Sequence, residues 1–291
     1  MSGALRYVSQ PFNSSAVTLR YKKGQESPRR FLIHINPPVD VPRTLASAPL
    51  KAIMTLIRAE RLVKTYHAGE VDVPAVRGVD FTIEAKSFVV FVGPSGSGKS
   101  TLLNMIGCLD HPTSGKLTVL DAQVGALDRR TAAEFRGKHI GFVFQDFNLI
   151  PVLTVYENIE YPLIMVQDWP EKKRREQVTR LLEAVGMSAQ ANKRPDQISG
   201  GQKQRVAVAR ALATNAQLVL ADEPTANLDH DTAYRVIELM KKMRDEFGTT
   251  FVFSTHDPKI MGAAEVIFTL EDGRIRKPAE KAAGKAEAVH A

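Results

Sequence analysis

The stretch that decides the fold reads Gly93-Pro94-Ser95-Gly96-Ser97-Gly98-Lys99-Ser100-Thr101. It fits the phosphate-loop pattern G-x-x-x-x-G-K-[ST], in which glycines let backbone N–H groups turn toward phosphate oxygens without obstruction by a Cβ atom. The pattern requires a strand before it and a helix after it. The sequence predicts both, an apolar strand over 88–92 and a helix over 100–108. We therefore expect this loop to bind nucleotide phosphates, with Lys99 supplying positive charge and Ser100 a hydroxyl ligand for Mg²⁺.

Two adjacent carboxylates, Asp222 and Glu223, follow a second apolar strand over 218–221. A carboxylate at such a strand end can hold Mg²⁺ through water, and its neighbour can then polarise the attacking water as a general base. The alternative is a pair of surface carboxylates, which the phosphate loop in the same chain disfavours. The sequence thus predicts Asp222 as a metal ligand and Glu223 as the catalytic base.

A third segment, Ile198-Ser199-Gly200-Gly201-Gln202, opens a predicted helix over 202–213. Ser199 offers a hydroxyl, and the two glycines offer backbone amides at the positive end of a helix. These are the properties of a second anion site. A Gly-Gly helix cap without a ligand is the alternative. Since the phosphate loop already holds the phosphates, a second anion site must serve a different purpose.

In their order and spacing these segments resemble the nucleotide-binding subunits of ABC transporters, and the resemblance covers about residues 54–276. It implies an ATPase with ATP and Mg²⁺ as cofactors. It also implies a head-to-tail homodimer with two ATP molecules at the interface. In that family the signature segment, here Ser199, Gly200, Gly201 and Gln202, closes on ATP held by the opposite subunit.

Four further residues are assigned by the resemblance. Gln145 matches the Q-loop glutamine, which reaches Mg²⁺ and the attacking water and links to the transmembrane partner. His256 matches the switch histidine at the γ-phosphate, and Asp229 matches the D-loop aspartate at the dimer interface. Tyr66 matches the aromatic residue that stacks on adenine. The sequence departs from the family at Ile198, usually Leu, and in the turn 84–87, which lacks the usual glycine, but no catalytic part is missing.

The sequence predicts an α/β fold, and the resemblance implies a P-loop NTPase (RecA-like) parallel core. Apolar strands over 140–144, 218–221, 250–253 and 266–270 alternate with helices, which is typical of such a core. We expect an antiparallel β subdomain over about 60–90 and an inserted helical signature subdomain over about 146–213. Apolar residues at helical spacing predict two further helix faces: Val178, Leu181, Leu182 and Val185 ending at Gly186, and Val236, Met240, Met243 and Phe247.

Composition separates a core from two tails. The formal net charge is +7, but residues 1–53 contain eight lysines and arginines against two acids. The core is thus near neutral, and we expect no nucleic-acid partner. The leader is predicted to be disordered. Met54 directly precedes the point where ABC ATPases normally begin, so we interpret this disordered leader as the product of an upstream start codon. A weak membrane-surface tether is the alternative. The tail, 277–291, is predicted to be disordered as well.

No stretch approaches the roughly 20 apolar residues that cross a bilayer. A transporter function therefore requires separate permease subunits, with this chain held peripherally at the cytoplasmic face of the inner (plasma) membrane. The apolar segment 147–153 is predicted to meet the permease; burial within the helical subdomain is the alternative. The single Cys108 excludes an intramolecular disulfide and suits a reducing compartment.

The segments 144–151 and 153–158 resemble the MacB/LolD-like subgroup, which releases lipoproteins or exports macrolides or antimicrobial peptides. Its permeases convert dimer closure into a mechanical stroke. A cell-division ABC ATPase that regulates wall hydrolysis and an amino-acid importer ATPase are the alternatives. ABC ATPases of chromosomes and DNA repair are disfavoured because only 101 positions separate Lys99 from Gly200, without heptads between them. ABC translation factors carry two cassettes, whereas this chain has one.

Overall fold

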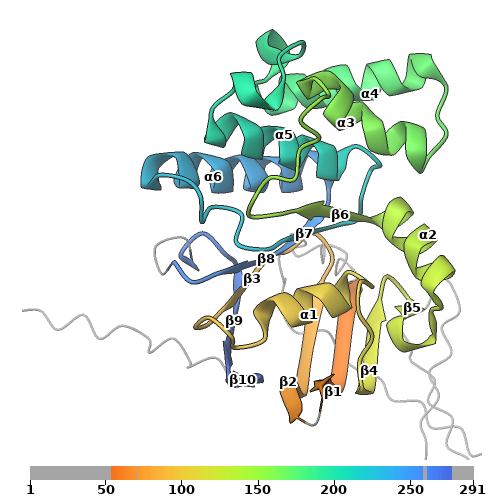
Figure 1. Cartoon of the computed structure of the whole chain (residues 1–291), viewed down its shortest axis with the longest axis vertical. Helices are drawn as coiled ribbons and strands as arrows, with labels where there is room; N and C mark the ends of the chain where they lie inside the picture. Colours follow the sequence, from red (N-terminus) through yellow and green to blue (C-terminus); the bar gives the residue numbers. More distant parts are fainter. Residues whose placement is uncertain (1–53, 70, 258–260, 277–291) are drawn as a thin grey trace, which may run out of the picture. The chain divides into compact units, whose positions relative to one another are not determined.

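The computed structural model describes residues 54–69, 71–257 and 261–276, so the expectations about the leader 1–53 and the tail 277–291 lie outside it. The described strands are β1 (Thr55–Ala68), β2 (Val71–Glu84), β3 (Phe88–Val92), β4 (Ser114–Val119), β5 (Ala122–Gln123), β6 (Ile140–Val143), β7 (Leu218–Ala221), β8 (Thr250–Thr255), β9 (Val266–Glu271) and β10 (Arg274–Arg276). The helices are α1 (Lys99–Ile106), α2 (Arg129–His139), α3 (Val155–Met165), α4 (Glu171–Ala184), α5 (Gly200–Leu212) and α6 (His230–Phe247), with single 3₁₀ turns at Val124–Ala126, Ser188–Gln190 and Pro195–Gln197 (Figure 1).

The core is a six-stranded sheet in the order β10-β9-β3-β8-β7-β6. Five of its strands run parallel, and β10 pairs antiparallel with β9 at one edge. The predicted strands are confirmed, and β8 runs on to Thr255, beyond the expected end at 253. Because β3, β7 and β8 are neighbours, the segments that follow them leave the same edge of the sheet.

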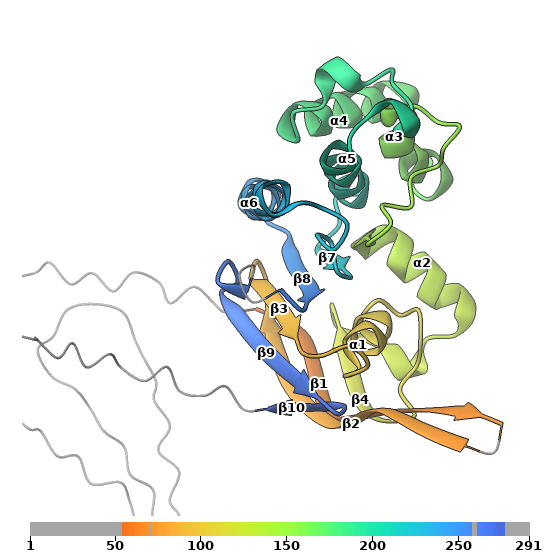
Figure 2. The ribbon, with the colours of Figure 1, turned by 60° about the vertical axis from the view of Figure 1, so that its left-hand side comes forward.

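The central strand β3 is buried on both faces, as its unbroken apolar sequence requires. Phe88, Val90 and Val92 face a core shared with α3 to α6. Val89 and Phe91 face a second core, shared with α1 and the antiparallel sheet. This alternation follows from the two-residue repeat of a strand. Figure 2 shows α1 on one side of the sheet and α5 and α6 on the other.

The predicted antiparallel subdomain is confirmed as a four-stranded sheet in the order β2-β1-β4-β5. β1 and β2 form a long hairpin, and β4 pairs along the other edge of β1. The backbone N–H of Arg77 donates to the carbonyl of Gly273 at 2.8 Å, which joins this sheet to the turn between β9 and β10. The hairpin is thereby fixed against the core sheet.

The helical part between β6 and β7 agrees with the expected apolar faces. Val178, Leu181, Leu182 and Val185 are buried, and Gly186 follows α4 with φ of 67°, the left-handed conformation that ends helices. α3 begins with a capping box between Thr154 and Glu157. On α6, Val236, Met240 and Met243 are buried and Phe247 packs against the same core.

The predicted end of the helix after the phosphate loop is wrong. The helix after the phosphate loop ends at Ile106 rather than 108, because Cys108 takes a left-handed φ of 53° that no helix accommodates. Burial raises the pKa of the Cys108 thiol to about 11, against the opposing charge of Arg136, so this is a protonated, packed thiol. No helix in the described part of the chain is long and apolar enough to cross a membrane.

Candidate nucleotide site

The predicted phosphate loop connects the end of β3 to the start of α1. Gly98 is the N-cap of α1 with φ of 102°, and a Cβ atom there would lie 2.3 Å from the carbonyl oxygen of Ala75. Gly96 also has a left-handed φ, of 76°. Both positions therefore require glycine: Gly98 because the Ala75 backbone leaves no room for a Cβ atom, and Gly96 because of its left-handed backbone conformation.

Polar groups gather inside this loop. Lys99 is 7% exposed, and its Nζ donates to the carbonyl oxygens of Gly93 at 2.8 Å and Pro94 at 3.0 Å. Ser97 is buried, yet its Oγ has no hydrogen-bond partner among the described residues. A buried ammonium and an unpaired buried hydroxyl at a helix N-terminus fit the phosphate groups of a nucleotide.

The two carboxylates lie beside the end of β8. The Asp222 Oδ1 accepts a hydrogen bond from the Ser254 hydroxyl at 2.6 Å, and the Ser254 Oγ accepts from the backbone N–H of Glu223 at 3.0 Å. The Glu223 carboxylate lies 3.0 Å from the Nδ1 of His256. The structure thus brings Asp222, Glu223 and His256 into one network at the carboxyl edge of the sheet.

Glu223 is held in an uncommon backbone conformation, with φ of 46°. A non-glycine residue rarely takes this left-handed geometry, and its occurrence at a functional site indicates a constraint by the surroundings. The Ser254 hydrogen bond to the Glu223 amide supplies such a constraint. In this conformation the Glu223 side chain is largely buried, whereas the His256 side chain is 66% exposed.

Ser254 is the residue that sequence reasoning missed. It is 0% exposed and bonds to both members of the carboxylate pair. A signal was present, because Ser254 precedes His256 by two positions at the end of a buried strand, and residues two apart share a face. Nothing in the sequence, however, indicates that this hydroxyl reaches across to β7.

The oxygen donors suit Mg²⁺. Ser100 lies in the first turn of α1, Gln145 is exposed after β6, and Asp222 directly follows β7. Hydroxyl, amide and carboxylate oxygens are hard ligands, and Mg²⁺ is commonly held by one or two protein groups together with water and substrate phosphates. No cluster of three or more histidines, cysteines or carboxylates that could hold a metal occurs among the described residues.

The signature segment caps α5. The Ser199 Oγ accepts from the N–H of Gln202 at 3.3 Å, and the Gln202 Oε1 accepts from the N–H of Ser199 at 2.9 Å. The helix therefore begins at Gly200, two residues earlier than predicted, because this capping box satisfies the first turn. Among the described residues, no hydrogen bond joins this segment to the phosphate loop of the same chain.

The segment after β6 is held from two sides. The Asn227 Nδ2 donates to the Gln145 carbonyl at 3.1 Å and to the Asp146 carboxylate at 2.9 Å. Arg210 on α5 donates to the Phe147 carbonyl at 2.9 Å and to the Asn148 carbonyl. The Gln145 loop is therefore connected to both the signature helix and the loop before α6.

Two predicted residues also have structural roles. Asp229 is the N-cap of α6, and its carboxylate accepts a hydrogen bond from the backbone N–H of Thr232 at 3.0 Å. Helix capping alone is therefore a sufficient structural reason for an aspartate at this position. Tyr66 is 38% exposed on the β1–β2 hairpin, and its hydroxyl donates to Asp110 at 2.8 Å. This exposed ring is available for stacking.

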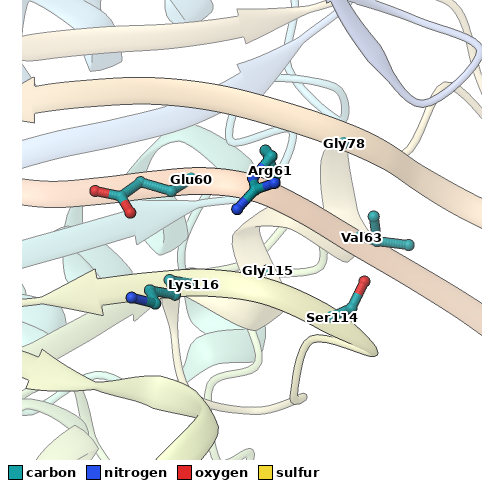
Figure 3. Close-up of a pocket in the computed structure, with 7 residues that line it drawn as sticks. All are labelled: Glu60, Arg61, Val63, Gly78, Ser114, Gly115 and Lys116. Carbon is teal, nitrogen blue, oxygen red and sulfur yellow. The ribbon is translucent and has the colours of Figure 1, made fainter.

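A hollow of about 590 Å³ lies on the antiparallel sheet and contains none of the predicted site residues (Figure 3). It is lined by Glu60, Arg61, Val63, Gly78, Ser114, Gly115 and Lys116. The register of β1 against β2 shifts between Ala59 and Leu62, and Arg61 takes a φ of 45°. The hollow is therefore a consequence of a β-bulge.

Comparisons with known proteins agree with this geometry. Residues 76–226 match the family model described as ABC transporter. The chain is 46% identical over 212 residues to the lipoprotein-releasing system ATP-binding protein LolD of Anaeromyxobacter dehalogenans, covering 73% of this chain and 89% of that protein. It is 41% identical over 221 residues to the macrolide export ATP-binding/permease protein MacB of Rhodopirellula baltica, covering 76% of this chain but only 32% of that longer protein.

A solved structure is similar over nearly its whole length. It is the dimeric post-hydrolysis state of the ATP-binding cassette MJ0796 of Methanocaldococcus jannaschii, bound to ADP and Pi. The sequence identity is 42% and the TM-score 0.70, covering 76% of this chain and 97% of that chain.

Proposed function

Because this chain belongs to the ABC transporter family, we propose that it is the ATP-hydrolysing subunit of a transporter complex and drives a separate permease. The similarity to LolD and MacB favours a permease that releases lipoproteins or exports drugs or peptides. The ATPase would then sit at the cytoplasmic face of the membrane, bound through that permease. A cell-division or importer ATPase is not better supported.

The network around Glu223 carries the proposal. In it the Glu223 carboxylate takes a proton from the attacking water as general base, and His256, 3.0 Å away, orients that carboxylate and contacts the transferred phosphoryl group. Lys99 stabilises charge on the same group from the phosphate loop. Mg²⁺, when held by Ser100, Gln145 and Asp222, would neutralise further phosphate charge.

A second copy of this chain completes the site in this proposal. The N-terminus of α5 offers the Ser199 hydroxyl and the first-turn amides of Gly200 and Gly201. In the part of the chain that the structure describes, no hydrogen bond joins these groups to the phosphate loop of the same chain. They would instead meet the γ-phosphate of ATP held by the opposite copy. The dimer of MJ0796 bound to ADP and Pi supports this arrangement.

The permease contact is proposed on the helical part. In the expected segment 147–153, Asn148, Pro151 and Val152 are exposed and the other side chains are partly buried. Asn158 binds the backbone of Ile150 and holds the segment against α3. Exposed apolar side chains continue along the end of α3: Tyr161, Ile164, Met165 and Val166, with Val152 at the tip of the segment. We therefore extend the proposed contact from this tip to the outer face of α3.

The Glu223→Gln variant tests the enzymatic part. Glutamine keeps the size of the side chain but cannot accept the proton, so ATP should still bind while turnover falls by roughly 100-fold or more. Without hydrolysis the closed state should persist, and light scattering should detect a dimer with ATP but not with ADP.

Glu238→Gln on the exposed face of α6 is the matched control. It removes a carboxylate of the same kind away from the site and should hydrolyse ATP at the rate of the unmodified protein. Rapid hydrolysis by Glu223→Gln would refute the assignment of the base. Absence of ATP binding by the unmodified protein would refute the proposed function as a whole.

A further inference from the structure

Tyr66 lies near the end of β1, where Val73 of β2 is its direct cross-strand partner. The two side chains are 38% and 48% exposed and form an apolar pair at this end of the sheet. One face of the tyrosine ring is covered, because the Lys64 ammonium lies 4.8 Å from the ring centroid. The opposite face is the one on which a flat base can stack.

Asp110 binds both the ammonium and the phenol. Its Oδ1 accepts from the Lys64 Nζ at 2.5 Å, and its Oδ2 accepts from the Tyr66 hydroxyl at 2.8 Å. The backbone N–H of His111 donates to Oδ1 at 2.7 Å, and Lys64 also donates to the carbonyl of His111 at 2.9 Å. One carboxylate therefore joins the ring and the ammonium to the chain segment that follows α1.

The ionised state of Asp110 agrees with this arrangement. Burial raises the pKa of its carboxyl, but hydrogen bonds from Lys64, Tyr66 and the His111 amide outweigh burial and hold the pKa below its ordinary value. Burial raises the pKa of Tyr66, and a hydrogen bond with Thr101 opposes that shift. Thr101 lies in the first turn of α1, directly after the phosphate loop, so the phenol is held between the start of α1 and Asp110.

We propose that Asp110 and Lys64 are positioning residues that hold the ring of Tyr66 at a fixed place relative to the phosphate loop, so that it receives the adenine base. The inference rests on the proposed nucleotide-binding function. A half-exposed tyrosine without these bonds would sample other rotamers, and ordering it again on binding would weaken affinity. The loss should affect only ligands that carry a base.

The test compares two ligands, MgATP and magnesium tripolyphosphate, by calorimetry and competition on the full chain. Asp110→Ala should raise the dissociation constant of MgATP by roughly three- to ten-fold. It should leave that of tripolyphosphate, which has no base, within about two-fold. In a Tyr66→Ala background, Asp110→Ala should cause no further loss of ATP affinity, because the ring through which it acts is gone.

Asp72→Ala is the matched control, since Asp72 pairs with His67 on the same hairpin at 2.5 Å and makes no hydrogen bond with Tyr66 in the described structure. It should leave both affinities unchanged. Lys64→Met is a second variant, which keeps the aliphatic stem and removes the charge, and it should reproduce the loss for ATP alone. If Asp110→Ala fails to fold, the Lys64→Met variant tests whether Tyr66 is held in place for the base.

Three outcomes would overturn the inference: equal losses for ATP and tripolyphosphate, an unchanged ATP affinity in both variants, or a further loss in the Tyr66→Ala background. These are distinct from failure of the proposed function. In that case the unmodified protein would bind neither ligand.

Discussion

At the scale of the residue, Ser254 is the side chain on which the carboxylate pair depends. Its hydroxyl donates to Asp222 and accepts from the Glu223 amide, so it sets the orientation of one carboxylate and the backbone of the other. Ser254→Ala should lower kcat by roughly 10- to 100-fold, as is typical when a residue that orients a reacting group is lost. The KM for ATP should change little, because the phosphate loop is untouched.

Thr250→Val is a control on the same strand. Thr250 begins β8, at the end of the strand opposite to the carboxylates. Its hydroxyl accepts a hydrogen bond from the backbone N–H of Lys86 at 2.8 Å. Its loss should lower stability by about 1–3 kcal/mol and leave kcat unchanged. Equal loss of kcat in both variants would show that strand stability, and not the orientation of the carboxylates, governs turnover.

At the scale of the element, α5 is coupled to the loop after β6 through Arg210. Phe147 and Asn148 have left-handed φ values of 61° and 47°, and their carbonyls receive the Arg210 guanidinium. Burial lowers the pKa of Arg210, but a guanidinium remains charged at any physiological pH. Charged hydrogen bonds of this kind hold the strained loop in place.

The Arg210→Met variant keeps most of the side-chain length and removes the donors. It should lower the free energy of unfolding by about 2–4 kcal/mol, since two carbonyls lose a charged partner. It should also expose the segment 147–153 to protease.

Arg205→Met on the same helix is the comparison, because the Arg205 bond to the Val185 carbonyl is long, at 3.5 Å. Its loss should cost less than about 1 kcal/mol. Similar losses in the two variants, both in unfolding and in protection from protease, would contradict a specific clamp by Arg210.

At the scale of the whole molecule, the sequence predicts the local elements well and their arrangement poorly. Continuous apolar runs identify β3, β7 and β8, because parallel strands are buried on both faces. Nothing local shows that β9, near the end of the described chain, pairs with β3. The motifs predict the phosphate loop and Glu223, whereas Ser254, Asp110 and Arg210 act through contacts between segments distant in sequence, which no pattern records.

The apolar face of α3 leads to a prediction about the assembly. Glu223→Gln with ATP, captured from native membranes, should bring down one membrane protein, and Ile164→Glu should release it by placing a charge on that face. A permease with few spans and a large extracytoplasmic domain would support lipoprotein release or export. A permease with more spans, accompanied by a solute-binding protein, would contradict it and favour an importer.

The bulge at Arg61 has a mechanical consequence for the end of the hairpin that carries Tyr66. Tyr66 lies five positions further along β1, about 16 Å at the rise of a strand. A rotation of ~10° at the bulge would swing the ring by about 3 Å. Gly115 leaves no room for a side chain, since a Cβ atom would lie 2.2 Å from the Arg61 carbonyl oxygen. A substitution that enlarges residue 115 should therefore change the geometry of the bulge and, through it, the position of Tyr66.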